Sequence, residues 1–352
     1  MKPSILIEKT TQSRLGTVDF SAIKFGKICA DHFFFADFQN GKWENLQISP
    51  YKNLSLSPAT SALHYGQSIF EGMKAYRNEH NDAFIFRPYD HLQRFNRSAK
   101  RMCMPEIPAD VFIQGLTELI RIDQSWIPTK LGDSLYIRPF MFGTDEFLGA
   151  RPSESYKFII FTSPANPYYL QPMNIKIETQ YARATEGGTG FTKCAGNYGA
   201  AFYPTALAMQ EGYHQILWTD SHEHLYVEEA GTMNIIFVID DILITPALSE
   251  TILQGITRDS ILTLAKEWKL PIEERKVKIS EVIKAITENR LQEAFGVGTA
   301  ATIAPIGMIG YKNEKYTIPV GNSSSFSQKA LVTLENIRRG KEQDKFNWLI
   351  KI

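Results

Sequence analysis

The sequence predicts a two-domain protein of the mixed α/β or α+β class, with mixed sheets and flanking helices. The chain has 352 residues, which suggests two domains at about 150 residues each. Short strand-like and helix-like stretches alternate irregularly, unlike the strict strand–helix order of a doubly wound sheet. Pro164, Pro167 and Pro172 mark a candidate linker. We therefore expect a smaller N-terminal domain over residues 1–164, a linker over 165–182 and a larger C-terminal domain over 183–352.

Apolar spacing predicts the individual elements. In the N-terminal half, the aromatic-rich run 27–38 is typical of a strand, and 134–141 and 156–162 are typical of buried strands. Amphipathic helices are expected over 91–102 and 110–122, with Pro105 and Pro108 between them, and a helix-like stretch lies within 57–76. In the C-terminal half we expect strands at 174–178, 215–218, 233–239 and 241–245, and helices at 257–268 and 327–339.

Charge and hydropathy exclude several classes of partner. Lys+Arg and Asp+Glu each number 38, so the zero net charge gives no electrostatic footprint for nucleic acid or an anionic membrane. The basic residues Arg94, Arg97, Lys100 and Arg101 are expected on a solvated helix face. The sequence contains no run of about 18 apolar residues, so we expect no membrane span.

Cysteine usage indicates a reducing compartment. Cys29, Cys103 and Cys194 are far apart and lack the spacing of a zinc site, so we expect neither a disulfide scaffold nor a metal site. The first 20 residues lack the long apolar core of a secretory signal. We therefore expect a cytoplasmic protein.

The most informative stretch is EGGTGFTKCAGNYG, residues 186–199, which places five glycines around Lys193. Glycine lets the backbone come close to a bound group. A lysine amine held in such a setting can form a Schiff base with a carbonyl compound such as pyridoxal 5'-phosphate (PLP). Lys193 is therefore a candidate PLP anchor, and the alternative is a solvated lysine in an ordinary loop.

Two nucleotide-binding motifs fit poorly. A P-loop needs Gly-Lys-Ser/Thr, whereas Lys193 follows a threonine and precedes a cysteine. GVGTAA at 296–301 matches part of a dinucleotide fingerprint, but Pro305 and Gly307 follow where a helix is required. A nicotinamide oxidoreductase using Gly296 and Gly298 stays open as an alternative, as does a non-catalytic binding protein.

Anion sites and carboxylates complete a possible PLP site. The glycine turn at 296–301 and the helix start at 255–260 each offer backbone N–H groups to a phosphate or carboxylate. PLP also needs a carboxylate beside its pyridine nitrogen, for which Glu228 and Glu229 are candidates.

From about Phe25 to its C-terminus, the chain resembles the branched-chain amino-acid aminotransferases, which are PLP enzymes of fold type IV. The matching motifs occur in family order: LHYG and FEGMK within 63–74, FRP at 86–88, SLYIRP at 134–139, the Lys193 segment, EAGTMN at 229–234 and GTA at 298–300. The resemblance implies a homodimer with the active site at the domain interface. The implied reaction transfers the amino group of leucine, isoleucine or valine to 2-oxoglutarate.

The resemblance also implies roles toward the cofactor. Lys193 would hold PLP covalently and later move a proton, Tyr198 would hydrogen-bond its phenolic oxygen, and Glu229 would pair with its pyridine nitrogen. The residues expected at the phosphate are Arg94, Ile256, Thr257 and Thr299.

Substrate roles follow in the same way. The amides of Thr299 and Ala300 would receive the substrate carboxylate, and Arg138 would help to seat the distal carboxylate of glutamate. The aliphatic pocket is expected to consist of Phe25, Tyr65, Phe70, Tyr168 and Thr232. The residues expected from the neighbouring subunit are Tyr136, Leu148 and Ala150.

One departure from the family concerns regulation. Mammalian members carry a Cys-x-x-Cys pair after Gly-Thr-Ala, where this chain has Ala301 and Ala304, so we expect no redox switch there. Within the fold type, the alternative is a D-amino-acid aminotransferase or an aminodeoxychorismate lyase, although those enzymes lack the SLYIRP pattern.

Overall fold

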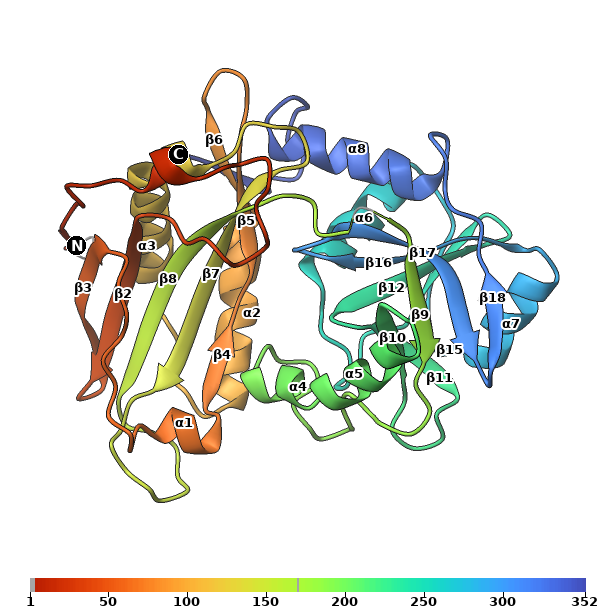
Figure 1. Cartoon of the computed structure of the whole chain (residues 1–352), viewed down its shortest axis with the longest axis horizontal. Coiled ribbons are helices and arrows are strands. Elements are labelled where there is room, and N and C mark those ends of the chain that lie inside the picture. Colours follow the sequence, from red (N-terminus) through yellow and green to blue (C-terminus); the bar gives the residue numbers. More distant parts are fainter. Residues whose placement is uncertain (1–3, 170) are drawn as a thin grey trace. The chain divides into compact units, whose positions relative to one another are not determined.

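The computed structural model describes residues 4–169 and 171–352 and contains two compact units (Figure 1). The first unit comprises the chain up to Tyr168, together with Lys193–Gly196 and Glu335–Ile352. The second unit comprises Tyr169–Thr192 and Asn197–Leu334. None of the described helices is long and apolar enough to cross a membrane.

The first unit is built on a nine-stranded sheet. Its order is β1 (Leu6–Ile7), β3 (Lys42–Pro50), β2 (His32–Gln39), β8 (Tyr156–Ala165), β7 (Ser134–Gly143), β5 (Met73–Arg77), β6 (Ala83–Phe86) and β19 (Leu349–Lys351), with β4 (Ser68–Phe70) also paired to β7. All neighbouring strands are antiparallel except β1 and β3. A short helix, α1 (Ser61–Tyr65), precedes β4.

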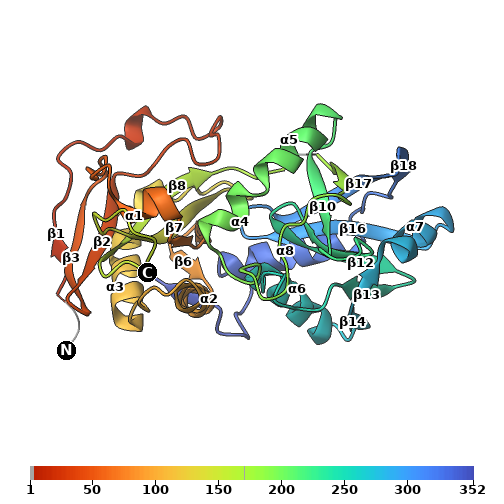
Figure 2. The same cartoon turned by 90° about the horizontal axis from the view of Figure 1, so that it is seen from below.

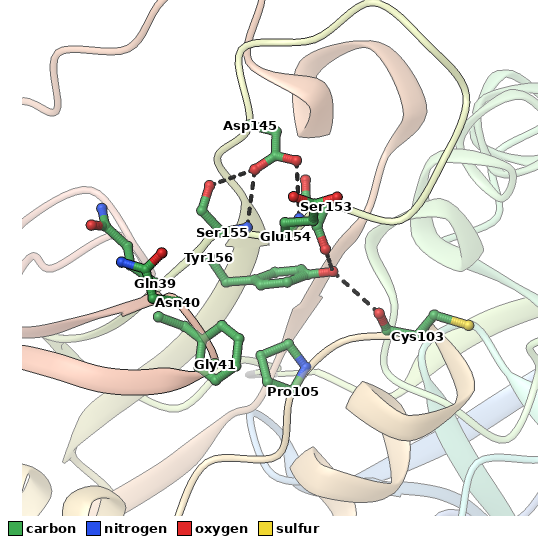
Figure 3. A pocket seen from close by; sticks show the side chains of 11 residues that line it. Gln39, Asn40, Gly41, Cys103, Pro105, Asp145, Ser153, Glu154, Ser155 and Tyr156 are labelled. Atoms are coloured by element: carbon green, nitrogen blue, oxygen red, sulfur yellow. Dashed lines mark hydrogen bonds between the residues drawn. The ribbon is translucent and has the colours of Figure 1, made fainter.

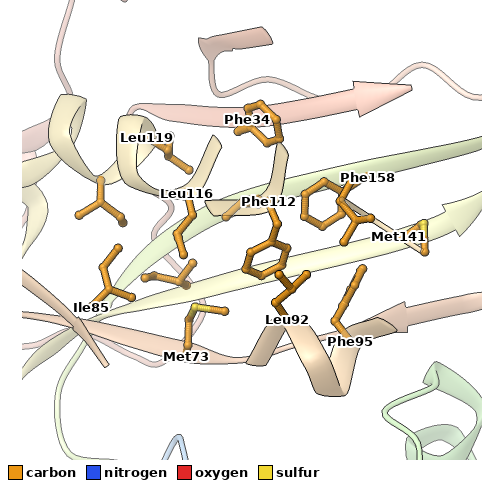
Figure 4. Packing of buried hydrophobic residues seen from close by; sticks show 14 of the residues in the cluster. Phe34, Met73, Ile85, Leu92, Phe95, Phe112, Leu116, Leu119, Met141 and Phe158 are labelled. Atoms are coloured by element: carbon orange, nitrogen blue, oxygen red, sulfur yellow. The ribbon is translucent and has the colours of Figure 1, made fainter. Parts of the chain in front are cut away.

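Two helices, α2 (Pro88–Arg101) and α3 (Ala109–Ile122), lie on one face of this sheet (Figure 2). Figure 4 shows their apolar side chains packed among those of the strands; the labelled members are Phe34, Met73, Ile85, Leu92, Phe95, Phe112, Leu116, Leu119, Met141 and Phe158. Full burial of one such side chain contributes about 1.5–3 kcal/mol. This cluster therefore fixes α2, which carries several residues of the candidate site.

The second unit is built on a ten-stranded sheet. Its order is β14 (Ile272–Glu274), β13 (Ile242–Thr245), β12 (Met233–Ile239), β16 (Leu291–Gly298), β17 (Thr302–Tyr311), β9 (Met173–Ile177), β10 (Gln215–Thr219), β11 (Tyr226–Ala230) and β15 (Val277–Lys278), with β18 (Glu314–Thr317) paired to β17. Because β11 also pairs with β12, the strands from β12 through β16, β17, β9 and β10 to β11 close into a ring.

The helices of the second unit are α5 (Phe202–Gln210), α6 (Ile256–Glu267), α7 (Ile279–Thr287) and most of α8 (Phe326–Arg338), and α4 (Ala195–Gly199) is divided between the two units. Val282 and Ala285 of α7 are buried in the same apolar cluster as Ile235 and Phe237 of β12. Gly255 directly precedes α6 and lies against the side chain of Asn234 from β12. This contact becomes part of the candidate site below.

The two units differ from the expected domains in two places. The change from first to second unit falls between Tyr168 and Tyr169, inside the expected linker 165–182. Lys193, which we expected in the C-terminal domain, groups with the first unit because the adjacent Cys194 pairs with Ile69 of β4. Residues 335–352 also return to the first unit, where β19 pairs with β6.

Most expected elements are present, but one interpretation was wrong, and one alternative that had fitted poorly is excluded. The helix-like stretch within 57–76 is helical only over α1, because Gly66 adopts a left-handed backbone (φ 65°) and the chain then continues into β4 and β5. Gly296 and Gly298 lie in β16 and are followed by β17 rather than by a helix. This geometry is incompatible with a dinucleotide fingerprint, which must open a helix.

Candidate active site

The backbone of Lys193 is held on both sides within the first unit. Its N–H donates to the Ser98 hydroxyl of α2 at 3.0 Å, and its carbonyl accepts from the N–H of Phe70 at 3.0 Å. The next residue, Cys194, is 3% exposed and packs in the main core of this unit. Lys193 is therefore positioned by β4 and α2 and does not lie on a loose loop.

The amine of Lys193 lies in a setting that favours its neutral form. Its Nζ atom is 4.7 Å from the centroid of the Phe70 ring. Burial, reinforced by the positive charge of Arg94, lowers the pKa of Lys193 from 10.5 to about 8. A neutral amine is the nucleophilic form, so this lysine is suited to attack a carbonyl carbon near neutral pH.

We expect the Lys193 amine of the ligand-free protein to titrate near pH 8. The measurement is the rate of acetylation of Lys193 at a series of pH values, followed by mass spectrometry of its peptide. The same lysine in the urea-unfolded chain serves as the control and should titrate near 10.5. Equal midpoints in the folded and unfolded protein would contradict the lowered pKa.

A buried ionic triad lies beside Lys193. Glu71, which is fully buried, accepts from Arg94 Nε at 2.7 Å and from Arg94 Nη2 at 2.8 Å. His91 Nδ1 lies 2.7 Å from the same carboxylate and donates to it. Although burial alone would raise the pKa of Glu71, the Arg94 charge and the hydrogen bonds from Arg94 and His91 hold it well below its usual range. Burial lowers the pKa of His91, so its imidazole is neutral at pH 7. The triad fixes the direction of the Arg94 guanidinium.

Replacing Glu71 with glutamine should lower the free energy of unfolding at neutral pH by about 3–5 kcal/mol, because Arg94 then stays buried opposite a neutral amide. The folded-state pKa of Glu71 lies below its unfolded value of 4.5, so its contribution is present above about pH 4.5 and declines as the pH falls below that value. Urea unfolding of both proteins at several pH values tests this.

The difference in unfolding free energy between wild type and Glu71→Gln should narrow below about pH 4.5. The control is Glu118→Gln, which removes a partly exposed pair with Arg121 and should change stability by about 0–1 kcal/mol. A difference that stays constant across the pH series would refute the assignment of the charge to Glu71.

Aromatic side chains surround Lys193 in the first unit. The Phe25 ring lies edge-on to Tyr136 at 4.8 Å and to Tyr168 at 5.2 Å, measured between ring centroids. The Arg138 guanidinium lies 4.6 Å from the centroid of Phe70, and its Nη2 donates to the Tyr136 hydroxyl at 3.1 Å. This arrangement offers apolar ring faces beside one cation.

Tyr136 was expected to come from the neighbouring subunit, but it lies near Lys193 of its own chain. Its hydroxyl bonds Arg138 of its own chain, and its charge acts on the pKa of Lys193. Its hydroxyl also sits against Gly72, where an added Cβ would lie only 2.0 Å from the oxygen. Tyr136 therefore belongs to the aromatic set around this chain's own lysine.

Tyr65, Leu148 and Ala150 occupy a different part of the first unit. Tyr65 donates its hydroxyl to the carbonyl of Leu148, and the two side chains are 44% and 66% exposed. Tyr65, the last residue of α1, is therefore bonded to the exposed loop that carries Leu148, whereas we had expected it beside Phe70 in the aliphatic pocket. Exposed apolar side chains at one loop are typical of a contact surface.

The base of this loop is firmly held. Asp145 accepts from the N–H of Glu154 at 2.9 Å and from the N–H and hydroxyl of Ser155 at 3.0 and 2.6 Å (Figure 3). The Tyr156 hydroxyl donates to the Ser153 carbonyl at 2.5 Å and lies 3.2 Å from the Cys103 carbonyl. The residues that make these bonds line an open hollow of about 690 Å³. The bonds hold the two ends of the loop 146–152 in place.

In the second unit, Glu229 is the centre of a buried polar cluster. Its carboxylate pairs with Arg183 Nε at 2.8 Å and accepts from Asn234 Nδ2 at 2.9 Å and from the Leu253 N–H at 3.1 Å. Glu228 has a different partner, since its Oε1 accepts from the Thr251 hydroxyl at 2.5 Å. Of the two glutamates, Glu229 is the one held by three donors.

The start of α6 lies beside this cluster. Asn234 links them, since it bonds both Glu229 and the carbonyl of Leu253. A Cβ at Gly255 would lie 1.8 Å from the Asn234 oxygen, so only glycine fits immediately before the helix. Ile256 and Thr257 form the first turn of this twelve-residue helix, where backbone N–H groups and the helix dipole stabilise an anion.

The other expected residues of the second unit lie at turns or in a short helix. Thr232 is exposed between β11 and β12, Thr299 and Ala300 lie in the turn between β16 and β17, and Tyr198 is in α4. Sequence reasoning placed these positions from motifs alone. It missed Glu71, His91, Ser98, Arg183 and Asn234, which form most of the supporting contacts.

Helical spacing in the sequence could have identified two of the missed residues, His91 and Ser98. His91, Arg94 and Ser98 follow helical spacing, so they share one face of α2, and all three are buried. Arg94 was therefore wrongly grouped with a solvated basic face. Arg97, Lys100 and Arg101 are exposed, as expected for such a face.

The chain is similar to known proteins along its whole length. Residues 68–309 match the model of the family described as amino-transferase class IV. The branched-chain-amino-acid aminotransferase 2 of Bacillus subtilis is 40% identical over 355 residues, covering 100% of this chain and 98% of that protein. The branched-chain-amino-acid aminotransferase of Mycolicibacterium smegmatis is 39% identical over 93% of this chain and 92% of its own length.

Solved structures agree in fold. The branched-chain amino acid aminotransferase of Escherichia coli superposes with a TM-score of 0.72 at 25% identity, covering 91% of this chain and 98% of that one. The enzyme of Thermoproteus uzoniensis, solved with norvaline, gives a TM-score of 0.74 at 24% identity over 90% and 99% of the two chains. The enzyme of Thermobaculum terrenum, solved in its PLP form, gives a TM-score of 0.73 at 22% identity over 90% and 97% of the two chains.

Proposed function

Because this chain belongs to the amino-transferase class IV family, we propose that it is a branched-chain amino-acid aminotransferase. It transfers the amino group of leucine, isoleucine or valine to 2-oxoglutarate, with PLP as its cofactor. The observation that carries the proposal is Lys193, whose backbone is held on both sides and whose pKa is lowered to about 8. Relatives with this named activity match the chain along its full length.

The residues of each unit fit this cofactor. The first unit offers a lysine amine with a lowered pKa and the buried cation Arg94. The second unit offers a buried carboxylate, Glu229, and a helix start where glycine alone fits. When bound, PLP supplies an electrophilic carbon for the substrate amine and a ring that accepts the electron pair of the substrate Cα–H bond.

Each group then has a defined task. Lys193 Nζ would hold the cofactor and would take up and return the Cα proton of the substrate. Glu229 keeps a proton on the ring nitrogen, since its negative charge is oriented by Arg183 and Asn234. Tyr198 hydrogen-bonds the phenolic oxygen. The phosphate is held by Arg94, Ile256, Thr257 and Thr299.

Substrate selection rests on apolar ring faces and two carboxylate sites. The residues proposed to contact the aliphatic side chain are Phe25, Phe70, Tyr168 and Thr232. Arg138 seats the distal carboxylate of 2-oxoglutarate, and Tyr136 orients it through the bond at 3.1 Å. The α-carboxylate binds the amides of Thr299 and Ala300. An apolar pocket of this kind separates substrates by about 1–3 kcal/mol per methylene.

We also infer a cytoplasmic homodimer. Leu148 and Ala150 are lent to the neighbouring subunit's site, and Tyr65 goes with them because its hydroxyl bonds Leu148. The exposed apolar side chains of this loop support the contact with a second copy. The cytoplasmic location is supported by three cysteines that are all unbridged.

A substrate panel tests the activity. Glutamate formation from 2-oxoglutarate should be fast with L-leucine, L-isoleucine and L-valine, and at least about 100-fold slower with D-alanine. Faster turnover of D-alanine would favour the D-amino-acid aminotransferase of the same fold type. Pyruvate formation from aminodeoxychorismate, without any transamination of leucine, would favour the lyase.

Thiol oxidants should leave leucine transamination unchanged within about twofold, because Ala301 and Ala304 stand where mammalian members have a cysteine pair. Activity is measured before and after diamide, and again after a reductant. Inhibition that the reductant reverses, and that persists in a Cys103→Ala variant lacking the exposed thiol, would contradict this expectation.

A further inference from the structure

We propose that the second unit carries a further binding pocket, which takes a small organic cation with an apolar body and recognises its charge through Glu228. Glu228 lines this pocket whereas Glu229 does not, so the pocket is distinct from the proposed pyridine-nitrogen partner. The proposed transamination assigns no role to it.

The pocket is a cavity of about 370 Å³ next to β11. Its apolar walls are formed by Tyr226, Val227, Pro246, Leu248 and Ile252. A volume of this size is near the lower end of small-molecule sites, which span about 300–1,000 Å³. Apolar walls of this kind suit the hydrocarbon part of a ligand.

Glu228 supplies the polar anchor of the pocket. It is only 7% exposed, and its Oε1 accepts from the Thr251 hydroxyl at 2.5 Å. No hydrogen-bond partner for its other oxygen, Oε2, lies among residues 4–169 and 171–352. Buried carboxylate oxygens are nearly always hydrogen-bonded, so a donor from a ligand would complete this one.

The charges around the cavity favour a cation. Glu186, Asp220 and Glu223 line it together with Glu228, against Lys276 and His222. The Asp220 carboxylate already accepts hydrogen bonds from the N–H groups of Glu223, Leu225 and Tyr226. The acceptor left for a ligand is therefore Oε2 of Glu228. Burial, together with the negative charges of Asp220 and Glu186, raises the pKa of Glu228. A bound cation would offset both effects.

An organic cation fits better than a metal ion. Within the described part of the chain, no three or more His, Cys, Asp or Glu side chains are grouped to hold a metal. A guanidinium or ammonium group needs only one carboxylate for a charge-assisted hydrogen bond, and its alkyl part would contact the apolar walls.

Binding is the appropriate readout because turnover could change indirectly. The Thr251 carbonyl accepts from Arg183 Nη1 at 2.9 Å, and Arg183 also pairs with Glu229. Substitution of Glu228 could therefore disturb Glu229 without any ligand being involved. Ligand binding to the PLP-loaded protein is independent of whether leucine is a substrate, which keeps this test separate from that of the proposed function.

The probe is n-butylguanidinium, which does not react with the cofactor aldehyde, and the neutral control of the same shape is n-butylurea. In titration calorimetry, wild type should bind the guanidinium with a dissociation constant on the order of millimolar and should not bind the urea. Absence of guanidinium binding, or equal binding of the urea, would overturn the proposal.

Three variants locate the site. Glu228→Gln should weaken guanidinium binding at least about tenfold, the loss expected for one charge-assisted hydrogen bond. Ala247→Phe, which fills the cavity, should also abolish binding, and it decides the question if Glu228→Gln does not fold. The matched control, Glu211→Gln, removes an exposed carboxylate paired with Lys176 and should leave binding unchanged. Unchanged binding in Ala247→Phe, or in a folded Glu228→Gln, would refute the site.

Discussion

Replacing Lys193 with alanine should lower kcat for leucine transamination by at least about four orders of magnitude. The amine is the group proposed both to bind the cofactor and to move the Cα proton, and alanine can do neither. The measurement is steady-state turnover with leucine and 2-oxoglutarate, together with the absorbance of the bound cofactor. A small added amine, such as methylamine, should restore part of the lost rate, which a merely unfolded variant would not show.

The matched control is Lys74→Met. Lys74 is also buried, and burial together with the Arg338 charge lowers its pKa to about 7, but the charges facing it are Arg338 and Glu335. Those facing Lys193 are Arg94 and Glu71. Lys74→Met should keep the cofactor absorbance and turnover within about tenfold. Near-normal turnover of Lys193→Ala, or loss of the cofactor absorbance in Lys74→Met alone, would mean that the wrong lysine has been assigned.

Glu229→Gln should slow the first half-reaction with leucine by about 100- to 1,000-fold, whereas Glu228→Gln should slow it by less than about tenfold. Glutamine keeps the shape of Glu229 but removes the charge that keeps the ring nitrogen protonated. Three donors hold the Glu229 carboxylate, whereas Glu228 bonds the Thr251 hydroxyl and lines a separate pocket. Stopped-flow absorbance after mixing with leucine measures both variants.

The unfolding free energy of both variants is the control, because Glu229→Gln leaves Arg183 buried opposite a neutral amide. If the folded Glu228→Gln variant is the slower of the two, the EAGTMN motif has been read one residue out of register.

Local backbone structure is what the sequence predicted well. The Lys193 segment is recognisable because its special residues are consecutive, and Gly190 does need to be glycine, since a Cβ there would lie 2.7 Å from the Thr251 carbonyl. The start of α6 is likewise coded by Gly255 and the apolar spacing that follows it. The strands and helices around these segments were predicted in outline for the same reason.

Contacts between distant residues could not be predicted in this way. Glu71 comes 20 and 23 positions before its partners His91 and Arg94, and no local pattern pairs them. The stretch 57–76 has helical spacing, but pairing of β4 and β5 with β7 overrides it. The bonds from Tyr65 to Leu148 and from Arg138 to Tyr136 could not be foreseen, because a motif gives position along the chain and not the direction of a side chain.

The most direct test of the central claim is the absorbance of the purified PLP-loaded protein before and after leucine is added alone. The account predicts that the visible band of the bound cofactor gives way to the near-ultraviolet band of pyridoxamine 5'-phosphate, and that 2-oxoglutarate then restores the first band. If PLP produces no protein-bound band, or if leucine leaves that band unchanged, the assignment of this chain as a branched-chain aminotransferase is contradicted.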